Sequence, residues 1–251
     1  MNLKLTIQYD GSRYNGWQRL GSTDNTIQEK LESTLSRILN QDIQINGSGR
    51  TDAGVHALAQ VANFKLDPSL IQSEYENLAS FVMNKANHYL PQDIKIIDCI
   101  QADERFHARL NAKSKTYEYR IDNGPVARIF DRKYLTRIEQ PLNIELMKKA
   151  SQYLLGSHDF IAFSSNKHMK KSSVRTITDI SITENDGIIA ISFTGNGFLY
   201  NMVRILVGTL IAVSNGDINA TDIPAILESK DRSQAGPTAP AEGLFLVKVE
   251  Y

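Results

Sequence analysis

The order of expected strands and helices is the feature that most limits how this chain of 251 residues can fold. Residues Leu3, Leu5, Ile7 and Tyr9 alternate with polar side chains, which predicts a half-buried strand. Thr26 with Glu29 three positions later has the pattern of a helix start, and Asn40 is expected to end that helix. The first half is therefore expected to run strand, helix, strand, strand, helix, strand, over residues 3–9, 26–40, 43–45, 58–66, 74–88 and 94–100.

The second half repeats this order without clear residue-level identity to the first. A hairpin turn is expected at Asn185-Asp186-Gly187, and a strongly apolar helix is expected from Phe198 to Ser214. The pattern predicts an α+β protein of two tandem ferredoxin-like halves, 1–104 and 105–251, whose antiparallel sheets flank a central active-site cleft. The expected elements of the second half are strands 116–121, 174–183, 188–193 and 244–250 and helices 143–154, 198–214 and 221–229.

Composition narrows the protein class. Hydrophobic residues make up 41% and charged residues 22%, as in ordinary globular proteins. No apolar run reaches the roughly 18 residues of a membrane span, and Met1 to Asp10 is expected to be a strand rather than a signal peptide. Cys99 is the single cysteine, which excludes an internal disulfide. We therefore expect a cytoplasmic protein with no membrane partner.

Charge gives a mixed indication about nucleic acid. The 28 basic and 28 acidic residues cancel, whereas nucleic-acid-binding proteins usually carry a basic excess. Two short stretches are nevertheless basic, and each is either a solvated surface or a phosphate-binding patch. The first stretch contains Arg105, His107, Arg109, Lys113, Lys115 and Arg120, and the second contains Lys167, His168, Lys170, Lys171 and Arg175.

A loop over residues 47–57 gathers chemically useful side chains. Three glycines allow sharp turns and close approach to a ligand, and Arg50, Asp52 and His56 lie among them. No Gly-Lys-Ser/Thr sequence follows, which argues against a nucleoside triphosphate loop. By composition alone, the loop is either an ordinary turn capped by Asp52 or part of an active site.

Two further segments favour an active site. Arg204 lies in the apolar helix, where it needs an anionic partner such as Asp52 or must extend to water. Tyr117 and Tyr119 are two positions apart on an expected strand and so face the same side. Beside basic residues, such tyrosines either stack on unpaired bases or belong to the core.

These segments together resemble the TruA family of tRNA pseudouridine synthases across nearly the whole chain. The matching stretches are 9–11, 16–19, 26–28, 49–57, 106–109, 115–119, 197–204 and 236–244. The resemblance implies that Asp52 is the essential carboxylate, that Arg204 pairs with it and that Tyr117 stacks on the target base. It also implies that Arg50 helps to displace that base, and Arg109 in the Phe106–Arg109 motif is expected to bind substrate. The family further implies a homodimer that modifies uridines at nucleotides 38 to 40 of the tRNA anticodon stem-loop.

The chemistry implied by this resemblance requires no cofactor or metal. Uracil leaves the ribose, turns and rejoins through carbon 5, so nothing is gained or lost, and the sequence offers no Cys/His cluster for a metal. Asp52 is expected to be ionised and to act on the ribose as a nucleophile or as a general base. The alternatives are the same chemistry on another RNA, an inactive RNA-binding homologue, a carbohydrate-acting enzyme with a second carboxylate near Asp10, or a scaffold protein.

Overall fold

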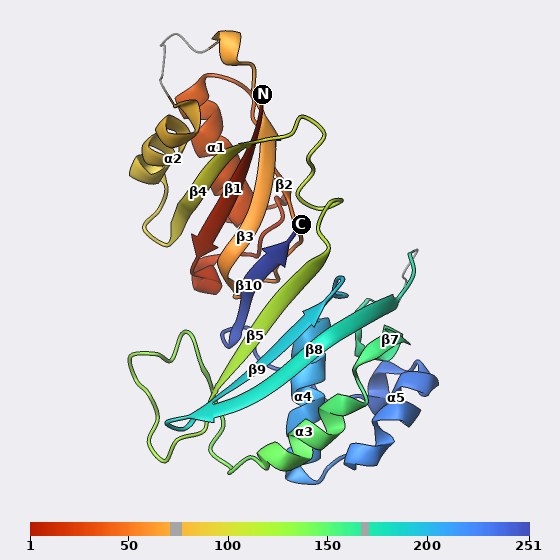
Figure 1. Cartoon of the computed structure of the whole chain (residues 1–251). Helices are drawn as coiled ribbons and strands as arrows, with labels where there is room; N and C mark the ends of the chain where they lie inside the picture. The colour runs from red at the N-terminus through yellow and green to blue at the C-terminus, as the bar shows by residue number, and fades with distance from the viewer. Residues whose placement is uncertain (71–76, 167–170) are drawn as a thin grey trace. The chain divides into compact units, whose positions relative to one another are not determined.

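The computed structural model describes residues 1–70, 77–166 and 171–251, which form two compact units (Figure 1). The first unit contains Met1–Lys113 and Leu246–Tyr251, and the second contains Ser114–Phe245. Each unit combines antiparallel strands with helices, so the α+β class is confirmed. The ferredoxin-like interpretation and the domain division at 104/105 stay predictions.

The sheet of the first unit is built around β1 (Asn2–Tyr9). β1 lies between β4 (Ile94–Ala102) and β3 (His56–Lys65) and is antiparallel to both. The two-residue strand β2 (Asn46–Gly47) pairs with the other edge of β3. Every second side chain of β1 points into the core, as the alternating sequence predicted, and Leu3, Leu5 and Ile7 are fully buried.

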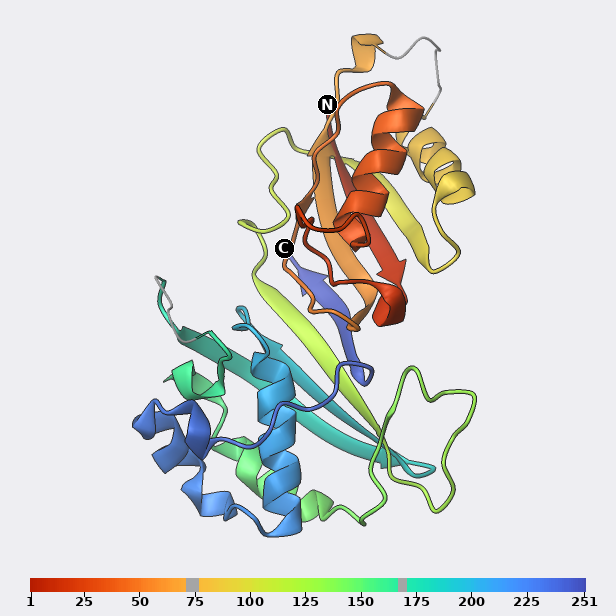
Figure 2. The same ribbon diagram turned by 180° about the vertical axis from the view of Figure 1, so that it is seen from behind.

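Two helices, α1 (Ile27–Leu39) and α2 (Leu78–Tyr89), cover one face of this sheet (Figures 1 and 2). The expected start of α1 is confirmed, because the Thr26 hydroxyl accepts a hydrogen bond of 3.3 Å from the Glu29 amide. Its expected end is also confirmed, because Asn40 adopts the left-handed conformation with φ 51°. Ile27, Leu31 and Leu35 are fully buried, and each side chain contributes roughly 1.5–3 kcal/mol through the apolar surface it removes from water.

The prediction of a strand at 43–45 is wrong, because backbone amides of this segment donate hydrogen bonds to side chains of helix α1 and not to a neighbouring strand. The Ile43 amide donates to the Ser36 hydroxyl at 2.9 Å, and the Ile45 amide donates to the Glu32 carboxylate at 2.9 Å. Pairing with β3 begins only at Asn46. For the helix expected at 74–88, residues 74–76 lie outside the described residues, and α2 begins at Leu78 with Asn77 as its cap.

The second unit contains a sheet in the order β5-β9-β8-β7. These strands are Ser114–Asp122 (β5), Ile188–Gly195 (β9), Val174–Asn185 (β8) and Gly156–Asp159 (β7), and neighbours are antiparallel. A short strand β6 (Thr136–Arg137) adds to β5 in parallel. The expected hairpin turn between β8 and β9 is confirmed, because Asp186 and Gly187 both have positive φ, of 49° and 71°.

The helices of the second unit are α3 (Ile144–Gln152), α4 (Met202–Asn215) and α5 (Ile223–Ser229). Helix α4 begins four residues later than the sequence predicted, because Asn201 adopts a left-handed conformation with φ 61° that interrupts helical geometry. The last strand, β10 (Leu244–Glu250), lies where the sequence predicted it. Within the described ranges, no helix is long and apolar enough to cross a membrane.

Candidate active site

The Asp52 loop joins β2 to β3 in the first unit, and the backbone on both sides of Asp52 is fixed. The Trp17 amide donates to the Thr51 carbonyl at 3.0 Å, and the Val55 amide donates to the Asp52 carbonyl at 3.1 Å. The Thr51 hydroxyl is also hydrogen-bonded to the buried Tyr9 hydroxyl at 2.7 Å. Asp52 itself is half-buried, so the loop presents a carboxylate from a rigid frame.

Glycines allow the segment after β1 to pack closely against this loop. Gly16 has φ +89°, and a side chain there would place its first carbon 2.7 Å from the Thr51 carbonyl oxygen. Gly54, within the loop, has φ 81°. Side chains other than glycine rarely adopt such backbone angles. The sequence predicted the need for glycine inside the loop, but it did not indicate that Gly16 supports the loop from outside.

His56 anchors the end of the loop rather than offering a free imidazole. Its ring is 1% exposed, and its Nδ1 accepts a hydrogen bond of 3.1 Å from the Gly11 amide. The Asp10 carboxylate lies 3.3 Å from the same nitrogen, a contact that is an ion pair only when the ring is protonated. Asp10 also accepts from the Ser12 amide at 2.9 Å and so caps the 3-10 helix Gly11–Arg13.

Arg50 and Arg109 are both exposed side chains of the first unit. The Arg50 Nε donates to the Gln18 side-chain oxygen at 2.9 Å. Arg109 follows a segment that buried asparagines hold in place: Asn2 donates to the Phe106 carbonyl at 2.9 Å, and Asn63 accepts from the Ala108 amide at 2.8 Å. Two predicted substrate-binding arginines therefore lie on anchored segments.

Arg204 lies in the first turn of α4, where it binds the chain segment that precedes β10. Its Nε donates to the Ala239 carbonyl at 2.7 Å, and the Ala239 amide donates back to the Arg204 carbonyl at 3.1 Å. Its Nη1 donates to the Asn201 side chain at 3.1 Å. Asp52 belongs to the first unit and Arg204 to the second, so their predicted pairing stays a prediction.

The two tyrosines of β5 differ in their surroundings. Tyr119 is fully buried, and its hydroxyl is hydrogen-bonded to Thr136 at 2.6 Å and donates to the Pro240 carbonyl at 2.9 Å. Tyr119 is therefore a core residue, and burial raises its pKa. Tyr117 is 7% exposed, and its ring packs nearly perpendicular to the Phe198 ring, with the ring centres 5.3 Å apart. Its stacking role stays a prediction.

The basic stretches are only partly available to a ligand. Arg105 and Lys113 are exposed, whereas Arg120 pairs with Glu118 at 2.7 Å and lies over the Phe245 ring. In the second stretch, Lys167, His168 and Lys170 lie outside the described residues. Among residues 1–70, 77–166 and 171–251, no group of three or more His, Cys, Asp or Glu side chains is placed to hold a metal.

Sequence reasoning missed the polar side chains behind the Asp52 loop. Gln60 on β3 accepts from the Ser48 hydroxyl at 2.7 Å and donates to the Gly49 carbonyl at 3.1 Å. Both Ser48 and Gln60 are fully buried. Their hydrogen bonds therefore provide partners for polar groups at the start of the loop that are closed off from water. One signal could have identified Gln60: it is a polar residue at a position of β3 whose side chain is expected to point into the core.

Comparison with known proteins assigns the family. The tRNA pseudouridine synthase family model matches residues 5–108 and 150–251. A protein named tRNA pseudouridine synthase A from a Bacillus species is 52% identical, and one named tRNA pseudouridine synthase A 2 from Bacillus cereus is 49% identical. A tRNA pseudouridine synthase A from Acetivibrio thermocellus is 44% identical. Each alignment covers 100% of this chain and 99% of the relative.

Among solved structures, a chain from the crystal structure of a Cbf5-Nop10-Gar1 complex matches 83% of this chain and 44% of its own length. Its TM-score of 0.37 and sequence identity of 12% are too low to support an argument. The family assignment depends on the family model and on the full-length relatives, which agree with the residue motifs 49–57 and 197–204. This chain belongs to the TruA family of tRNA pseudouridine synthases.

Proposed function

We propose that this protein isomerises uridine to pseudouridine in the tRNA anticodon stem-loop, at nucleotides 38 to 40, with Asp52 as the catalytic carboxylate. The observation that carries the proposal is the full-length similarity, at 44–52% identity, to proteins named tRNA pseudouridine synthase A. The fixed backbone around Asp52 supports the assignment of the catalytic residue, because an enzyme gains rate by holding its reacting group in place.

The reaction breaks the bond from ribose C1′ to uracil N1 and forms a bond from C1′ to uracil C5. The proton lost from C5 is balanced by the proton gained at N1, so no oxidant, reductant or metal is required. Asp52 acts at the ribose by one of two routes. Its carboxylate bonds to C1′ as the base leaves, or it takes a ribose proton and gives a glycal-like intermediate.

The remaining predicted residues have supporting roles. Arg204 pairs with the Asp52 carboxylate and directs it. The proposal therefore includes two ferredoxin-like halves that flank a central cleft, in which this pair meets. Tyr117 stacks on the displaced uracil, a contact worth roughly 1–3 kcal/mol per base. Because Tyr117 is 7% exposed, stacking requires its ring to become accessible when RNA binds. Arg50 and Arg109 contact the RNA through their exposed guanidinium groups.

An assay on unmodified tRNA transcripts tests the proposal. Pseudouridine is measured by nucleoside analysis for the parent protein, for Asp52→Asn and for Asp42→Asn, whose exposed carboxylate lies outside the loop. We expect the parent and Asp42→Asn to form pseudouridine and Asp52→Asn to form none. Transcripts that lack uridine at single positions from 38 to 40 test the site. If the parent binds several tRNAs without modifying them, an inactive RNA-binding homologue or another RNA target replaces this proposal.

The proposal extends to the assembly and the cellular location. The family resemblance implies a homodimer with tRNA bound across both subunits, and a tRNA substrate agrees with the expected cytoplasmic location. Sedimentation of the purified protein tests the first point. A monomer at the concentrations at which the enzyme is active would remove the homodimer from the proposal.

A further inference from the structure

We propose that Gln18 is a positioning residue that holds Arg50 through a neutral acceptor, so that the arginine is directed and still keeps its positive charge for RNA. The inference depends on the proposed function, in which Arg50 contacts the substrate. It assigns a role to the segment before α1. It starts from one contact, the 2.9 Å hydrogen bond from Arg50 Nε to the Gln18 side-chain oxygen.

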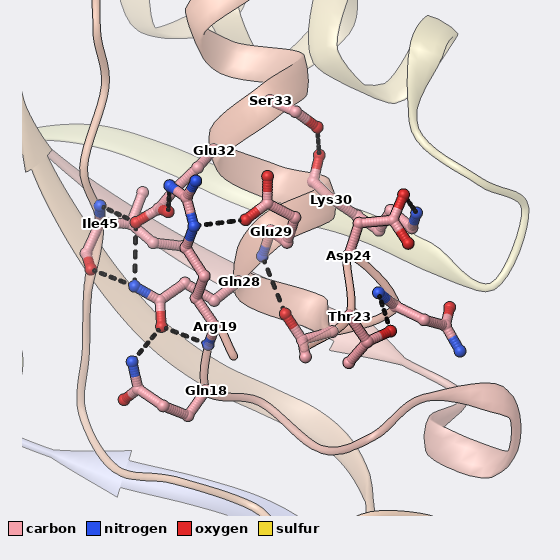
Figure 3. Close-up of polar contacts among 12 residues, drawn as sticks. Gln18, Arg19, Thr23, Asp24, Gln28, Glu29, Lys30, Glu32, Ser33 and Ile45 are labelled. Carbon is pink, nitrogen blue, oxygen red and sulfur yellow. Dashed lines mark hydrogen bonds and ion pairs between the residues drawn. The ribbon is translucent and has the colours of Figure 1, made fainter. Parts of the chain in front are cut away.

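Gln18 is itself held by a chain of hydrogen bonds that leads into the core (Figure 3). Gln18 Nε2 donates to Gln28 Oε1 at 2.9 Å, and Gln28 Nε2 donates to Glu32 Oε1 at 2.9 Å. Glu32 lies on α1, is 4% exposed, and also accepts from the Ile45 amide at 2.9 Å. The chain therefore begins at a buried carboxylate that the backbone holds in place, and it ends at an exposed arginine.

The donors and acceptors along this chain fix the direction of both amide groups. Gln28 Oε1 accepts from Gln18 Nε2 and from the Arg19 backbone amide, at 2.9 and 3.1 Å. A carboxylate can only accept, so Gln28 must direct its nitrogen toward Glu32 and its oxygen toward Gln18. Gln18 must then direct its nitrogen inward, which leaves its oxygen for Arg50. A rotated Gln18 amide would place two donors against each other.

The neighbouring Arg19 offers a comparison, because its partners are acidic. Its guanidinium contacts Glu29 at 2.6 Å and Glu32 at 3.4 Å, so two carboxylates compensate its charge (Figure 3). Within the described residues, the Arg50 guanidinium donates to the uncharged Gln18 amide. Arg19 and Arg50 are both exposed, so they differ in the charge of their partner: carboxylates compensate Arg19, whereas a neutral amide directs Arg50 without compensating its charge.

Two substitutions of Gln18 separate direction from charge. Gln18→Ala removes the acceptor but leaves the Arg50 charge, so we expect kcat on tRNA to fall about 10-fold while the salt dependence of binding stays unchanged. Gln18→Glu keeps an acceptor for Arg50, but it loses the donor to Gln28 and adds a negative charge. We expect its kcat to fall less than that of Gln18→Ala, whereas the slope of log affinity against log salt becomes shallower by about 1.

The experiment measures kcat, KM and salt slope for Gln18→Ala, Gln18→Glu, Arg50→Ala and the double variant Gln18→Ala/Arg50→Ala. Gln44→Ala, an exposed glutamine outside the network, is the matched control. Gln18 is only half-buried, so its variants should fold, and thermal unfolding midpoints check this. If Gln18 acts through Arg50, the double variant is no slower than Arg50→Ala.

The proposal is overturned if the double variant is slower than Arg50→Ala by the full factor that Gln18→Ala causes alone. It is also overturned if Gln18→Glu leaves the salt slope at the parent value. A parent protein that makes no pseudouridine on any tRNA instead contradicts the proposed function, so the two failures are distinguishable.

Discussion

At the residue scale, the Asp52 loop depends on neighbours that do no chemistry. The Tyr9 hydroxyl and the Trp17 amide are hydrogen-bonded to Thr51, and the Gln60 side chain donates a hydrogen bond to the Gly49 carbonyl. Each such hydrogen bond contributes about 1 kcal/mol net, but a buried group left without its partner costs about 1–3 kcal/mol. The loop conformation is therefore favoured over alternatives by several independent contacts, which is the condition for a preorganised carboxylate.

Gly16→Ala tests this support. Its φ of +89° and the 2.7 Å approach to the Thr51 carbonyl oxygen leave no room for a methyl group. We expect the free energy of unfolding to fall by roughly 1–3 kcal/mol, as for strain at a special backbone position. We expect kcat to fall about 100-fold, because a displacement of about 1 Å at a reacting group costs that much.

Pseudouridine formation and urea denaturation measure the two effects of Gly16→Ala. Gly21→Ala is the control, because a methyl group there meets no atom within 4 Å. A Gly16→Ala enzyme with parental kcat would mean that the segment before α1 does not hold the Asp52 loop in place.

The sequence singled out the loop and three of its side chains and assigned Arg204 to Asp52 from the resemblance, but it gave no partner for Arg50 or His56. Asp52 and Arg50 were identified from the glycines around them and from the family motif. His56 belongs to the same motif, yet it is a buried anchor for the Gly11 amide. Contacts such as Gln18 with Arg50 join residues 32 positions apart, and local sequence patterns carry no information at that separation.

At the element scale, helix α4 is coupled to the segment before β10 by glycines as well as by Arg204. A side chain on Gly208 would collide with the Pro237 carbonyl group, and one on Gly236 would lie 2.6 Å from the Thr209 Cα. The Gly236 amide donates to the Thr209 hydroxyl at 2.9 Å. This packing brings Ala239 to Arg204, so the position of the arginine depends on Gly208, one turn along the same helix, and on Gly236, which lies far from it in sequence.

Gly208→Ala tests that coupling. Alanine normally favours a helix over glycine by about 1 kcal/mol. Here the methyl group would push the 236–240 segment off the helix, and we expect a net loss of roughly 2 kcal/mol or more in the free energy of unfolding. Activity should fall further than stability, because Arg204 loses the Ala239 carbonyl. An unfolding free energy equal to or above the parental value would contradict the packing argument.

Element boundaries were predictable where local chemistry decides them. Thr26 acts through its own side chain, and Asn40 and the Asp186-Gly187 turn act through their own backbone. These predictions are confirmed. Two predicted boundaries were wrong. The left-handed conformation of Asn201 delays the start of α4, and Phe198, which precedes it, packs against Tyr117. At 43–45, Glu32 of α1 accepts the Ile45 amide instead of leaving it to a strand.

At the scale of the whole molecule, the zero net charge conceals an uneven distribution. Some arginines are compensated within the fold, as Arg120 is by Glu118 and Arg128 by Asp186. Others, including Arg50, Arg105 and Arg109, are exposed. A neutral total therefore does not exclude a locally positive surface for RNA, and this is why the composition alone argued weakly against the function that the family assigns.

Each unit also contains a buried phenol, and this predicts how the stability of the whole molecule responds to alkaline pH. Burial is the largest cause of the raised pKa of Tyr9 in the first unit and of Tyr119 in the second. Burial likewise raises the pKa of the Cys99 thiol from 9.0 to about 12. In all three groups, the folded protein holds its proton at a pH where the unfolded chain releases it.

The sign of the effect follows from proton binding. Below about pH 8 both states bind these protons, so the groups add no pH dependence. Above pH 9 for Cys99 and above pH 10 for the tyrosines, using their ordinary pKa values, the unfolded state binds fewer protons and stability falls as pH rises. Each buried tyrosine should remove about 1.4 kcal/mol from the free energy of unfolding by pH 11.

Urea denaturation at pH 8, 10 and 11 measures this decline, and phenolate absorbance shows whether ionisation accompanies unfolding. Tyr9→Phe and Tyr119→Phe each remove one phenol, so each variant should lose less stability between pH 8 and pH 11 than the parent, whatever its stability at pH 8. A parent protein equally stable at pH 8 and 11, or variants whose decline matches the parental one, would mean that these phenols are not sealed from water in the folded state.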